Sequence, residues 1–274
     1  MRGTPTEQRA TLPHPPGPEA ARGRPAGPAS VIALDIGARY ISGTVMTTDG
    51  RVRESERWYT RPERGPDAVV DTVLGCATDL AALADRREAP VAAAGLVLSG
   101  SVDGLAGVAT AEPDWAAAPL RSWLEEHLDV PVTLGHAGHA GAVAEGRLGA
   151  GRGCEAFAFV TSADPVLVAV MRAGRSVREA AFDAATLSPD ARAATLSTAD
   201  TRALAALILA ADVEKVVVGG PLPRMDTALR QTIDSALRRA RRQGPRPDVI
   251  AGRVGGRAAC LGAAMMAREL VASH

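Results

Sequence analysis

Lysine is almost absent from this chain: among its 31 lysine and arginine residues, Lys215 is the only lysine. A phosphate-binding P-loop needs a lysine inside a GxxxxGK(S/T) string, and no such string surrounds Lys215. A nucleotide site of the P-loop type is therefore excluded.

Long apolar runs and closely spaced cysteines are also missing. No apolar run reaches the roughly 18 residues of a membrane-spanning helix, and nothing before Val31 has the apolar core of a secretory signal. Cys76, Cys154 and Cys260 lie far apart, form no CxxC zinc pattern and leave one thiol unpaired in any disulfide scheme. We therefore predict a cytoplasmic protein with no membrane partner and no metal site.

An excess of charge is absent as well, because 31 cations balance 31 acidic residues. A net charge of zero gives the protein no general electrostatic attraction to nucleic acid. No helix-turn-helix pattern precedes Val31. We predict no nucleic-acid partner.

Residues 1–30 contain seven prolines and four glycines without apolar periodicity. Such a composition cannot bury enough surface to offset its ordering entropy, so we predict a disordered tail. The remainder has ordinary globular composition, with 46% hydrophobic and 23% charged residues overall, and is expected to fold.

The first half of the folded region begins with an apolar run at 31–36. Strands are predicted at 40–48 and 51–59 on either side of Asp49-Gly50, a dipeptide typical of tight hairpin turns. The following segments are predicted as helix 67–87, strand 91–98, helix 119–128 and strand 130–134.

The second half repeats this theme in shorter form. Its predicted elements are strands 156–161 and 166–171, helix 198–211, strand 215–218, helix 225–242, strand 249–251 and helix 256–271. The pattern predicts a mixed-sheet α/β protein with domains at 31–134 and 135–255 around one cleft. The closing helix could pack back onto the first domain.

Five strings, in this order, resemble the ROK family of bacterial sugar kinases and repressors. They are ALDIGARYISGTVMTTDGRV, GLVLSGSVDGLAGVATAEPDW, PLRSWLEEHLDVPVTL, EKVVVGGPLPRM and GGRAACLGAAMMARELV. The resemblance covers about residues 31–271. It implies the actin-like ATPase (ribonuclease H-like) fold, with two mixed sheets flanked by helices, and self-association into a homo-oligomer, expected to be a dimer.

The resemblance also implies a nucleotide or anion site. Asp35, Gly37 and Arg39 match the opening hairpin motif that faces the phosphates, and Gly219 and Gly220 match the turn that faces the adenosine. Glycine at such positions lets backbone amides approach an anion. These glycines could equally only turn the chain.

The string GHAGHAGAVAE departs from the family pattern at the catalytic loop. The resemblance places the catalytic aspartate of ROK kinases at Ala137, and His136 and His139 stand where the family has asparagines. An alanine methyl cannot accept a proton, so an acid–base contribution of roughly 10²–10⁴ in rate is expected to be lost.

Other family elements are missing too. TSADPVLVAV, with Asp164 and Pro165, stands where a glycine-rich phosphate loop is expected, and Arg39 replaces the threonine of the opening motif. The ExGH sugar-binding motif and the CxCGxxGCxE zinc segment are absent. ATP and Mg²⁺ are therefore expected as cofactors only if the chain is a kinase after all.

Several polar residues remain as candidates for a small-molecule site. His136 and His139 are candidate acid–base residues on one face of a helix start, although they could also be packing residues. Asp103, Asp114, Trp115 and Glu145 are candidate ligand-binding residues, because a carboxylate beside an aromatic ring suits a polyol. Turn chemistry equally explains Asp103, and Trp115 could face the core.

Three functions follow from these observations. The first is a non-kinase protein of the ROK fold that binds a sugar-like metabolite as a binder, sensor or assembly partner. The second is a repurposed enzyme with His136 and His139 as acid and base. The third is an ATP-dependent sugar kinase with an unusual base.

Overall fold

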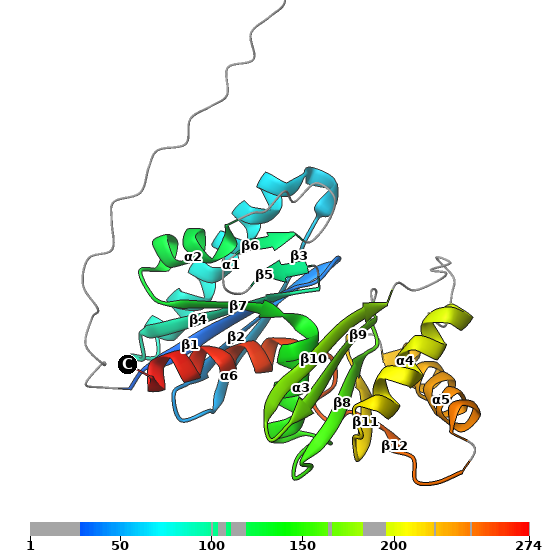
Figure 1. The fold of residues 1–274 in the computed structure, drawn as a ribbon. Coiled ribbons are helices and arrows are strands. Elements are labelled where there is room, and N and C mark those ends of the chain that lie inside the picture. The colour runs from blue at the N-terminus through cyan, green and yellow to red at the C-terminus, as the bar shows by residue number, and fades with distance from the viewer. Residues whose placement is uncertain are drawn as a thin grey trace, which may run out of the picture.

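The computed structural model describes residues 28–99, 101–103, 108–110, 119–163, 166–182, 196–221, 223–241 and 243–273. In this part of the chain, two five-stranded mixed sheets are flanked by helices (Figure 1). The predicted α/β architecture is therefore confirmed. Most of the predicted tail, residues 1–27, lies outside the described residues, and the first strand begins at Ser30, one residue earlier than predicted.

The first sheet has the strand order β3-β2-β1-β4-β7. Its strands are β1 (Ser30–Ile36), β2 (Tyr40–Thr47), β3 (Val52–Tyr59), β4 (Val91–Leu98) and β7 (Val132–His136). β1, β2 and β3 form an antiparallel meander, as the sequence predicts, whereas β4 and β7 run parallel to β1. α1 (Pro66–Asp85) and α2 (Leu120–Leu128) pack on one face through Leu80 and Leu124.

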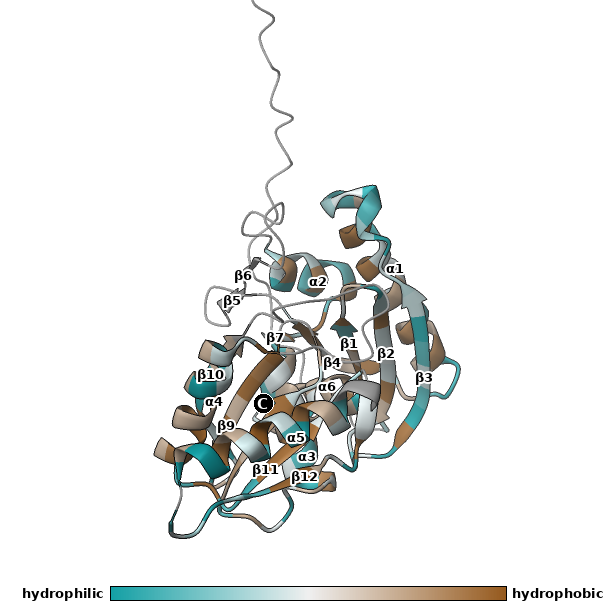
Figure 2. Cartoon of the chain, turned by 90° about the vertical axis from the view of Figure 1, so that its right-hand side faces the viewer, coloured by the Kyte–Doolittle hydropathy of each residue, from teal (hydrophilic) through white to brown (hydrophobic). Residues whose placement is uncertain are grey.

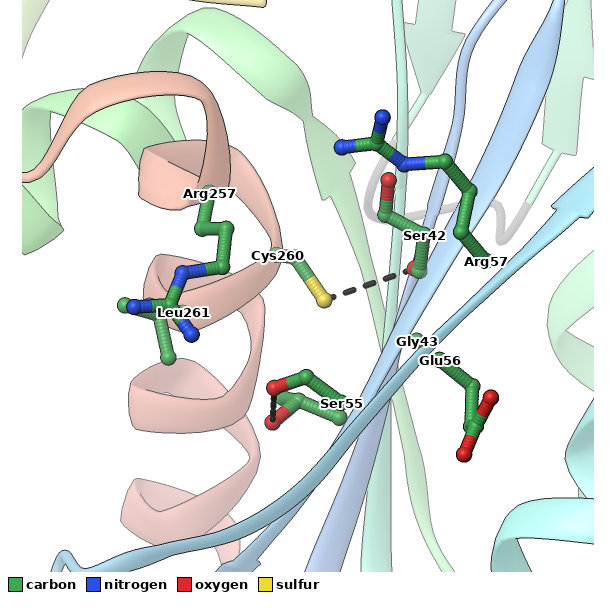
Figure 3. A pocket seen from close by; sticks show the side chains of 9 residues that line it. Ser42, Gly43, Ser55, Glu56, Arg57, Arg257, Cys260 and Leu261 are labelled. Carbon is green, nitrogen blue, oxygen red and sulfur yellow. Dashed lines mark hydrogen bonds between the residues drawn. The ribbon is translucent and has the colours of Figure 1, made fainter.

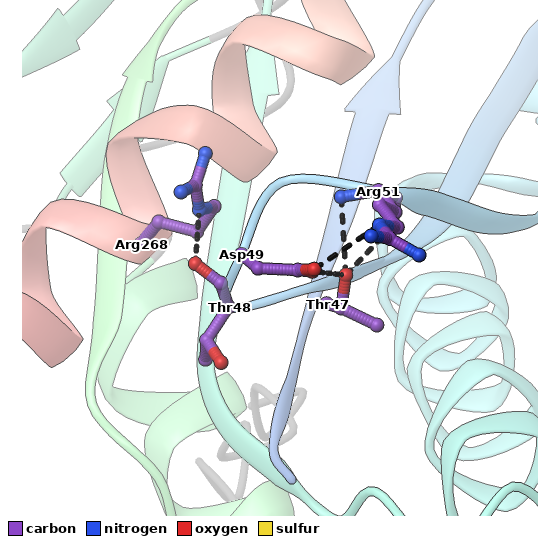
Figure 4. Close-up of polar contacts among 5 residues, drawn as sticks. All are labelled: Thr47, Thr48, Asp49, Arg51 and Arg268. Atoms are coloured by element: carbon purple, nitrogen blue, oxygen red, sulfur yellow. Dashed lines mark hydrogen bonds and ion pairs between the residues drawn. The ribbon is translucent and has the colours of Figure 1, made fainter.

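The hairpin between β2 and β3 turns at Asp49 and Gly50. Gly50 has a φ of 96°, which a residue with a side chain rarely adopts. The Thr47 hydroxyl donates to the Asp49 carboxylate and also accepts the Arg51 amide, while the Arg268 guanidinium donates to the Thr48 carbonyl (Figure 4). The Asp-Gly prediction is thus confirmed, and the turn is tied to the last helix.

The second sheet has the order β10-β9-β8-β11-β12. Its strands are β8 (Ala156–Thr161), β9 (Val166–Arg172), β10 (Arg175–Phe182), β11 (Lys215–Gly219) and β12 (Asp248–Ala251). α4 (Thr198–Ala210) and α5 (Pro223–Ala240) cover one face, with Leu204, Ile208 and Leu229 in the shared core. β10 was not predicted, and neither was the two-stranded sheet of β5 (Ser101–Asp103) and β6 (Val108–Thr110).

Two helices, α3 (Ala137–Leu148) and α6 (Ala258–Ala272), join the sheets through one apolar core. α3 packs on β8 and β9, α6 packs on β1 and β4, and the helices also pack on each other (Figure 1). A Cβ on Gly262 would collide with the Ala140 carbonyl, and a Cβ on Gly95 would collide with the Ala263 carbonyl. Glycine at these positions therefore permits the close contacts.

The free edge of the first sheet is polar. Most of β3, the edge strand of the first sheet, is exposed and hydrophilic (Figure 2). All three cysteines are free. In the described part of the chain, none of the helices is long and apolar enough to span a membrane.

Candidate functional site

Three parallel strands of the first sheet end together. In register, Ile36 of β1 lies beside Leu98 of β4, and Leu98 lies beside His136 of β7. The carboxyl ends of parallel strands are where α/β folds place ligands. Asp35, one residue before the end of β1, and His136 therefore lie at the same functional edge.

Asp35 is a partly buried carboxyl group in β1. Burial raises its pKa to about 7, and the nearby Arg57 guanidinium opposes this rise. A carboxyl with such a pKa exchanges a proton near neutral pH, which makes it a candidate for proton transfer or for charge-dependent ligand binding.

The loop after β1 is a tight turn. The Gly37 amide donates to the Tyr40 carbonyl at 3.0 Å, and the Gly37 carbonyl accepts from the Thr60 hydroxyl at 2.7 Å. The backbone amide that the sequence assigns to an anion is therefore used inside the turn. Arg39 is exposed, and its guanidinium carbon lies 5.8 Å from the centre of the Tyr40 ring.

The β7–α3 junction places Ala137 at the first position of α3. Ala137 is only 5% exposed and belongs to the apolar core between the sheets. A Cβ on Gly138 would lie 2.9 Å from Cβ of Leu167, so the helix start packs closely against β9. The methyl group of Ala137 thus lies in an apolar environment.

His139, one helical turn into α3, pairs with a carboxylate from β10. Its Nδ1 lies 2.8 Å from Oε1 of Glu179, and this oxygen also accepts from the Ser176 hydroxyl at 2.9 Å. The hydrogen bond from His139 is the main cause that lowers the pKa of Glu179. A carboxylate that contacts an imidazole in this way fixes the orientation of the ring.

His136 belongs to the same cluster. Burial lowers its pKa, Glu179 raises it, and His139 lowers it further. Glu179 therefore interacts electrostatically with His136 and contacts His139 directly. Among the described residues, no group of three or more His, Cys, Asp or Glu side chains is arranged to hold a metal ion.

Glu145 lies farther along α3 and is fully buried. Its carboxylate accepts the backbone amides of Ala150 at 2.8 Å, Arg253 at 3.1 Å and Val254 at 2.8 Å. These contacts join the end of α3 to the loop that precedes α6. The described contacts give Glu145 a structural role, in contrast to the polyol contact that the sequence suggests.

Gly219 and Gly220 lie at the end of β11, next to the end of β8. The Ser162 amide donates to the Gly219 carbonyl at 3.0 Å, and a Cβ on Gly220 would lie 2.9 Å from Ser162. Ser162 is fully buried, and Asp226 in the first turn of α5 interacts with it. Burial raises the pKa of Asp226, so this turn holds a second carboxyl with perturbed titration.

The remaining candidates are not described. Asp103 lies in β5, but its side chain is outside the described residues, as are Asp114, Trp115, Asp164 and Pro165. The structure therefore brings His136 and His139 together and places Asp35 at the same sheet edge.

Glu179 was missed by sequence reasoning. It lies 40 positions from His139, in a strand whose sequence has no apolar alternation. Only the pairing of β10 with β9 brings it to the start of α3.

Comparison with known proteins relates the chain to one family. The ROK family model matches residues 31–163. A search among curated proteins gives no match.

Solved structures of ROK proteins superpose on the chain. The ROK hexokinase of Thermus thermophilus is 23% identical, with a TM-score of 0.68 over 89% of this chain and 100% of its own. A ROK glucokinase of Streptomyces griseus, solved with glucose and AMPPNP, is 20% identical, with a TM-score of 0.69 over 88% and 100%. A ROK transcriptional regulator, a homolog of the E. coli MLC protein, is 13% identical, with a TM-score of 0.66 over 88% and 78%.

The actin-like fold of the ROK family is thus present in a chain in which the family model matches residues up to 163. The resemblance seen in the sequence is confirmed: residues 31–163 match the ROK family, and the chain has the fold shared by ROK kinases and a ROK regulator.

Proposed function

We propose that this chain is a non-kinase ROK protein that binds a small sugar-like molecule and acts as a binding or regulatory protein. The observation that carries the proposal is the packing of Ala137. At the first position of α3, where the family resemblance expects a catalytic aspartate, a methyl group lies 5% exposed in the apolar core. Such a group can neither take a proton from a hydroxyl nor hydrogen-bond to it.

The polar groups that remain beside Ala137 suit binding. His136 and His139 offer ring nitrogens, and Glu179 offers a carboxylate that is held ionised by its hydrogen bonds. Donors and acceptors of this kind match the hydroxyl groups of a polyol. The S. griseus glucokinase was solved with glucose, which supports a sugar-like ligand for this chain.

The first experiment measures phosphoryl transfer by the purified chain. ATP, Mg²⁺ and each of several hexoses are incubated with the protein, and ADP and sugar phosphate are quantified. We expect neither product above the level without protein. Sugar-dependent formation of both products would overturn the non-kinase proposal.

The second experiment measures binding of the same hexoses by calorimetry in the absence of nucleotide. We expect at least one to bind, and His139→Ala to weaken that binding while the thermal unfolding of the protein stays unchanged. His127→Ala is the control, because this histidine lies on α2 and contacts Thr78. Absence of binding by every sugar would exclude the sugar-like ligand.

A repurposed enzyme is the second candidate, and the His139–Glu179 pair favours it. A carboxylate 2.8 Å from an imidazole nitrogen is the arrangement of a positioned general base. If the chain turns over a metabolite, His139→Ala and Glu179→Gln should both abolish turnover without loss of folding. Turnover that survives both substitutions excludes this role for the pair.

An ATP-dependent kinase with an unusual base is the third candidate. It requires nucleotide binding near the Gly219–Gly220 turn and Asp35. Calorimetry with ATP tests it directly, and absence of binding at millimolar concentration removes it. Self-association into a homodimer is a separate proposal, which sedimentation equilibrium tests.

A further inference from the structure

A pocket of about 170 Å³ lies between β2, β3 and the start of α6. Its lining side chains come from the two strands on one side and from Arg257, Cys260 and Leu261 on the other (Figure 3). No step of the proposed function uses it.

The strand face that forms the pocket changes character along its length. At one end it is apolar, with Val31 opposite Met46, and both lie in the core beneath α6. At the other end Asp35, Ser42 and Arg57 lie directly opposite one another on β1, β2 and β3. Because paired residues share a face, these three polar side chains form one row beside α6.

Two cationic groups share this small space. Arg57 comes from β3, and Arg257 immediately precedes α6. Within the residues that the structure describes, neither guanidinium has a hydrogen bond or an ion pair. The Arg57 guanidinium carbon lies 5.4 Å from the centre of the Tyr40 ring, which orients the group and leaves its N–H donors available.

Apart from Asp35, which shares the row with Arg57, the nearby acidic groups leave this positive charge uncompensated. Glu56 also borders the pocket, but its carboxylate points away from α6 (Figure 3). Glu54 is already paired with Arg87 at 2.8 Å. Burial raises the pKa of the Cys260 thiol well above its usual range, so the sulfur is neutral and donates to the Ser42 carbonyl at 3.4 Å.

We propose that this pocket binds a phosphate-class oxyanion, held by the guanidinium groups of Arg57 and Arg257 and by the Ser42 hydroxyl. Two guanidinium groups can donate several charge-assisted hydrogen bonds to such an anion, and its negative charge removes their mutual repulsion. The proposal does not rest on the sugar-binding function. Free phosphate, a sugar phosphate and a nucleotide share this chemistry.

The experiment titrates the full chain with inorganic phosphate, glucose 6-phosphate and ATP in three separate calorimetric series at low ionic strength. Each series is repeated with Arg57→Gln and Arg257→Gln. Arg53→Gln is the matched control, since it removes the same charge from an exposed position of β3 that does not line the pocket. Thermal unfolding without anion establishes that each variant folds.

We expect at least one of the three compounds to bind, and each pocket variant to raise its Kd by about tenfold or more, with Arg53→Gln close to wild type. The compound with the lowest Kd identifies the source of the anion. If none binds, or if the folded pocket variants bind as wild type does, the proposal is overturned.

Sulfate supplies a second readout because its charge does not change between pH 5 and 8. Asp35 interacts electrostatically with Arg57 and with Cys260 at the start of α6. Its ionised carboxylate competes with the anion, so sulfate should bind more tightly at pH 5.5 than at pH 8. Asp35→Asn should remove this difference, and a difference that persists in the variant would contradict the competition.

Discussion

The Glu145 carboxylate on α3 accepts the backbone amide of Val254 at 2.8 Å, across 109 positions of the chain. The same carboxylate accepts the amides of Arg253 and Ala150. One buried side chain thus satisfies three backbone donors in two loops that are far apart in the sequence. It also fixes the approach of the chain to α6.

Loss of this carboxylate should strongly destabilise the protein. Glu145→Ala leaves the buried Ala150 amide and the part-buried Arg253 and Val254 amides without this acceptor, so the free energy of unfolding should fall by about 2 kcal/mol or more. Urea denaturation measures this change. Glu126→Ala, at an exposed position of α2, should change it by less than about 0.5 kcal/mol. Similar effects for the two variants would refute the structural role.

The contact between α3 and α6 should tolerate no side chain at Gly262. A Cβ there collides with the Ala140 carbonyl of the backbone, so Gly262→Ala should cost about 3 kcal/mol or more or prevent folding. Gly75→Ala is the control, because nothing lies within 4 Å of a Cβ at that helical position. It should stabilise the protein by about 0.5–1 kcal/mol. Thermal unfolding compares the two, and a neutral Gly262→Ala would contradict the packing.

Asp35 should make stability fall with rising pH. Its pKa is raised to about 7 in the folded chain, from 3.8 for a free aspartate, so the folded state binds the proton more tightly. The contribution of Asp35 to stability is therefore greatest below pH 4, declines as pH rises to about 7 and is constant above it. Asp35→Asn should remove this slope and exceed wild-type stability above pH 7 by up to about 4 kcal/mol. An unchanged difference between the two proteins from pH 4 to 8 would disprove the assignment.

The His139–Glu179 pair should be visible in carboxyl NMR titrations. Because the His139 hydrogen bond is the main cause of the lowered pKa of Glu179, His139→Ala should raise that pKa. Ser176→Ala should raise it less, since its hydrogen bond is the smaller contribution. The reverse order of the two shifts would contradict this account of the cluster.

Elements with a local signal could be predicted from the sequence. The hairpin at Asp49-Gly50 could be predicted because few residues other than glycine adopt the backbone conformation of this turn. The bounds of strands 91–98 and 156–161 were predicted in full because buried strands are continuous apolar runs. β10 could not be predicted, because it is an edge strand with many exposed residues and no apolar alternation. Its identity depends on pairing with β9.

The site was only partly accessible to sequence reasoning. His136 and His139 were found because they stand beside Ala137 in a recognisable string. Glu179 was missed because its contact with His139 depends on tertiary structure alone. The buried state of Glu145 was equally hidden, because its partners are backbone amides, which no residue type reveals.

The position of α6 has a consequence for folding during synthesis. Cys260 of α6 donates to the Ala33 carbonyl, 227 positions earlier in the chain. Because α6 packs on the apolar face of the first sheet, this face stays exposed until α6 has left the ribosome. Until then, the nascent chain exposes Val31, Ala33 and Met46 to other proteins. A chaperone that shields this face during translation would therefore be expected to raise the yield of native protein.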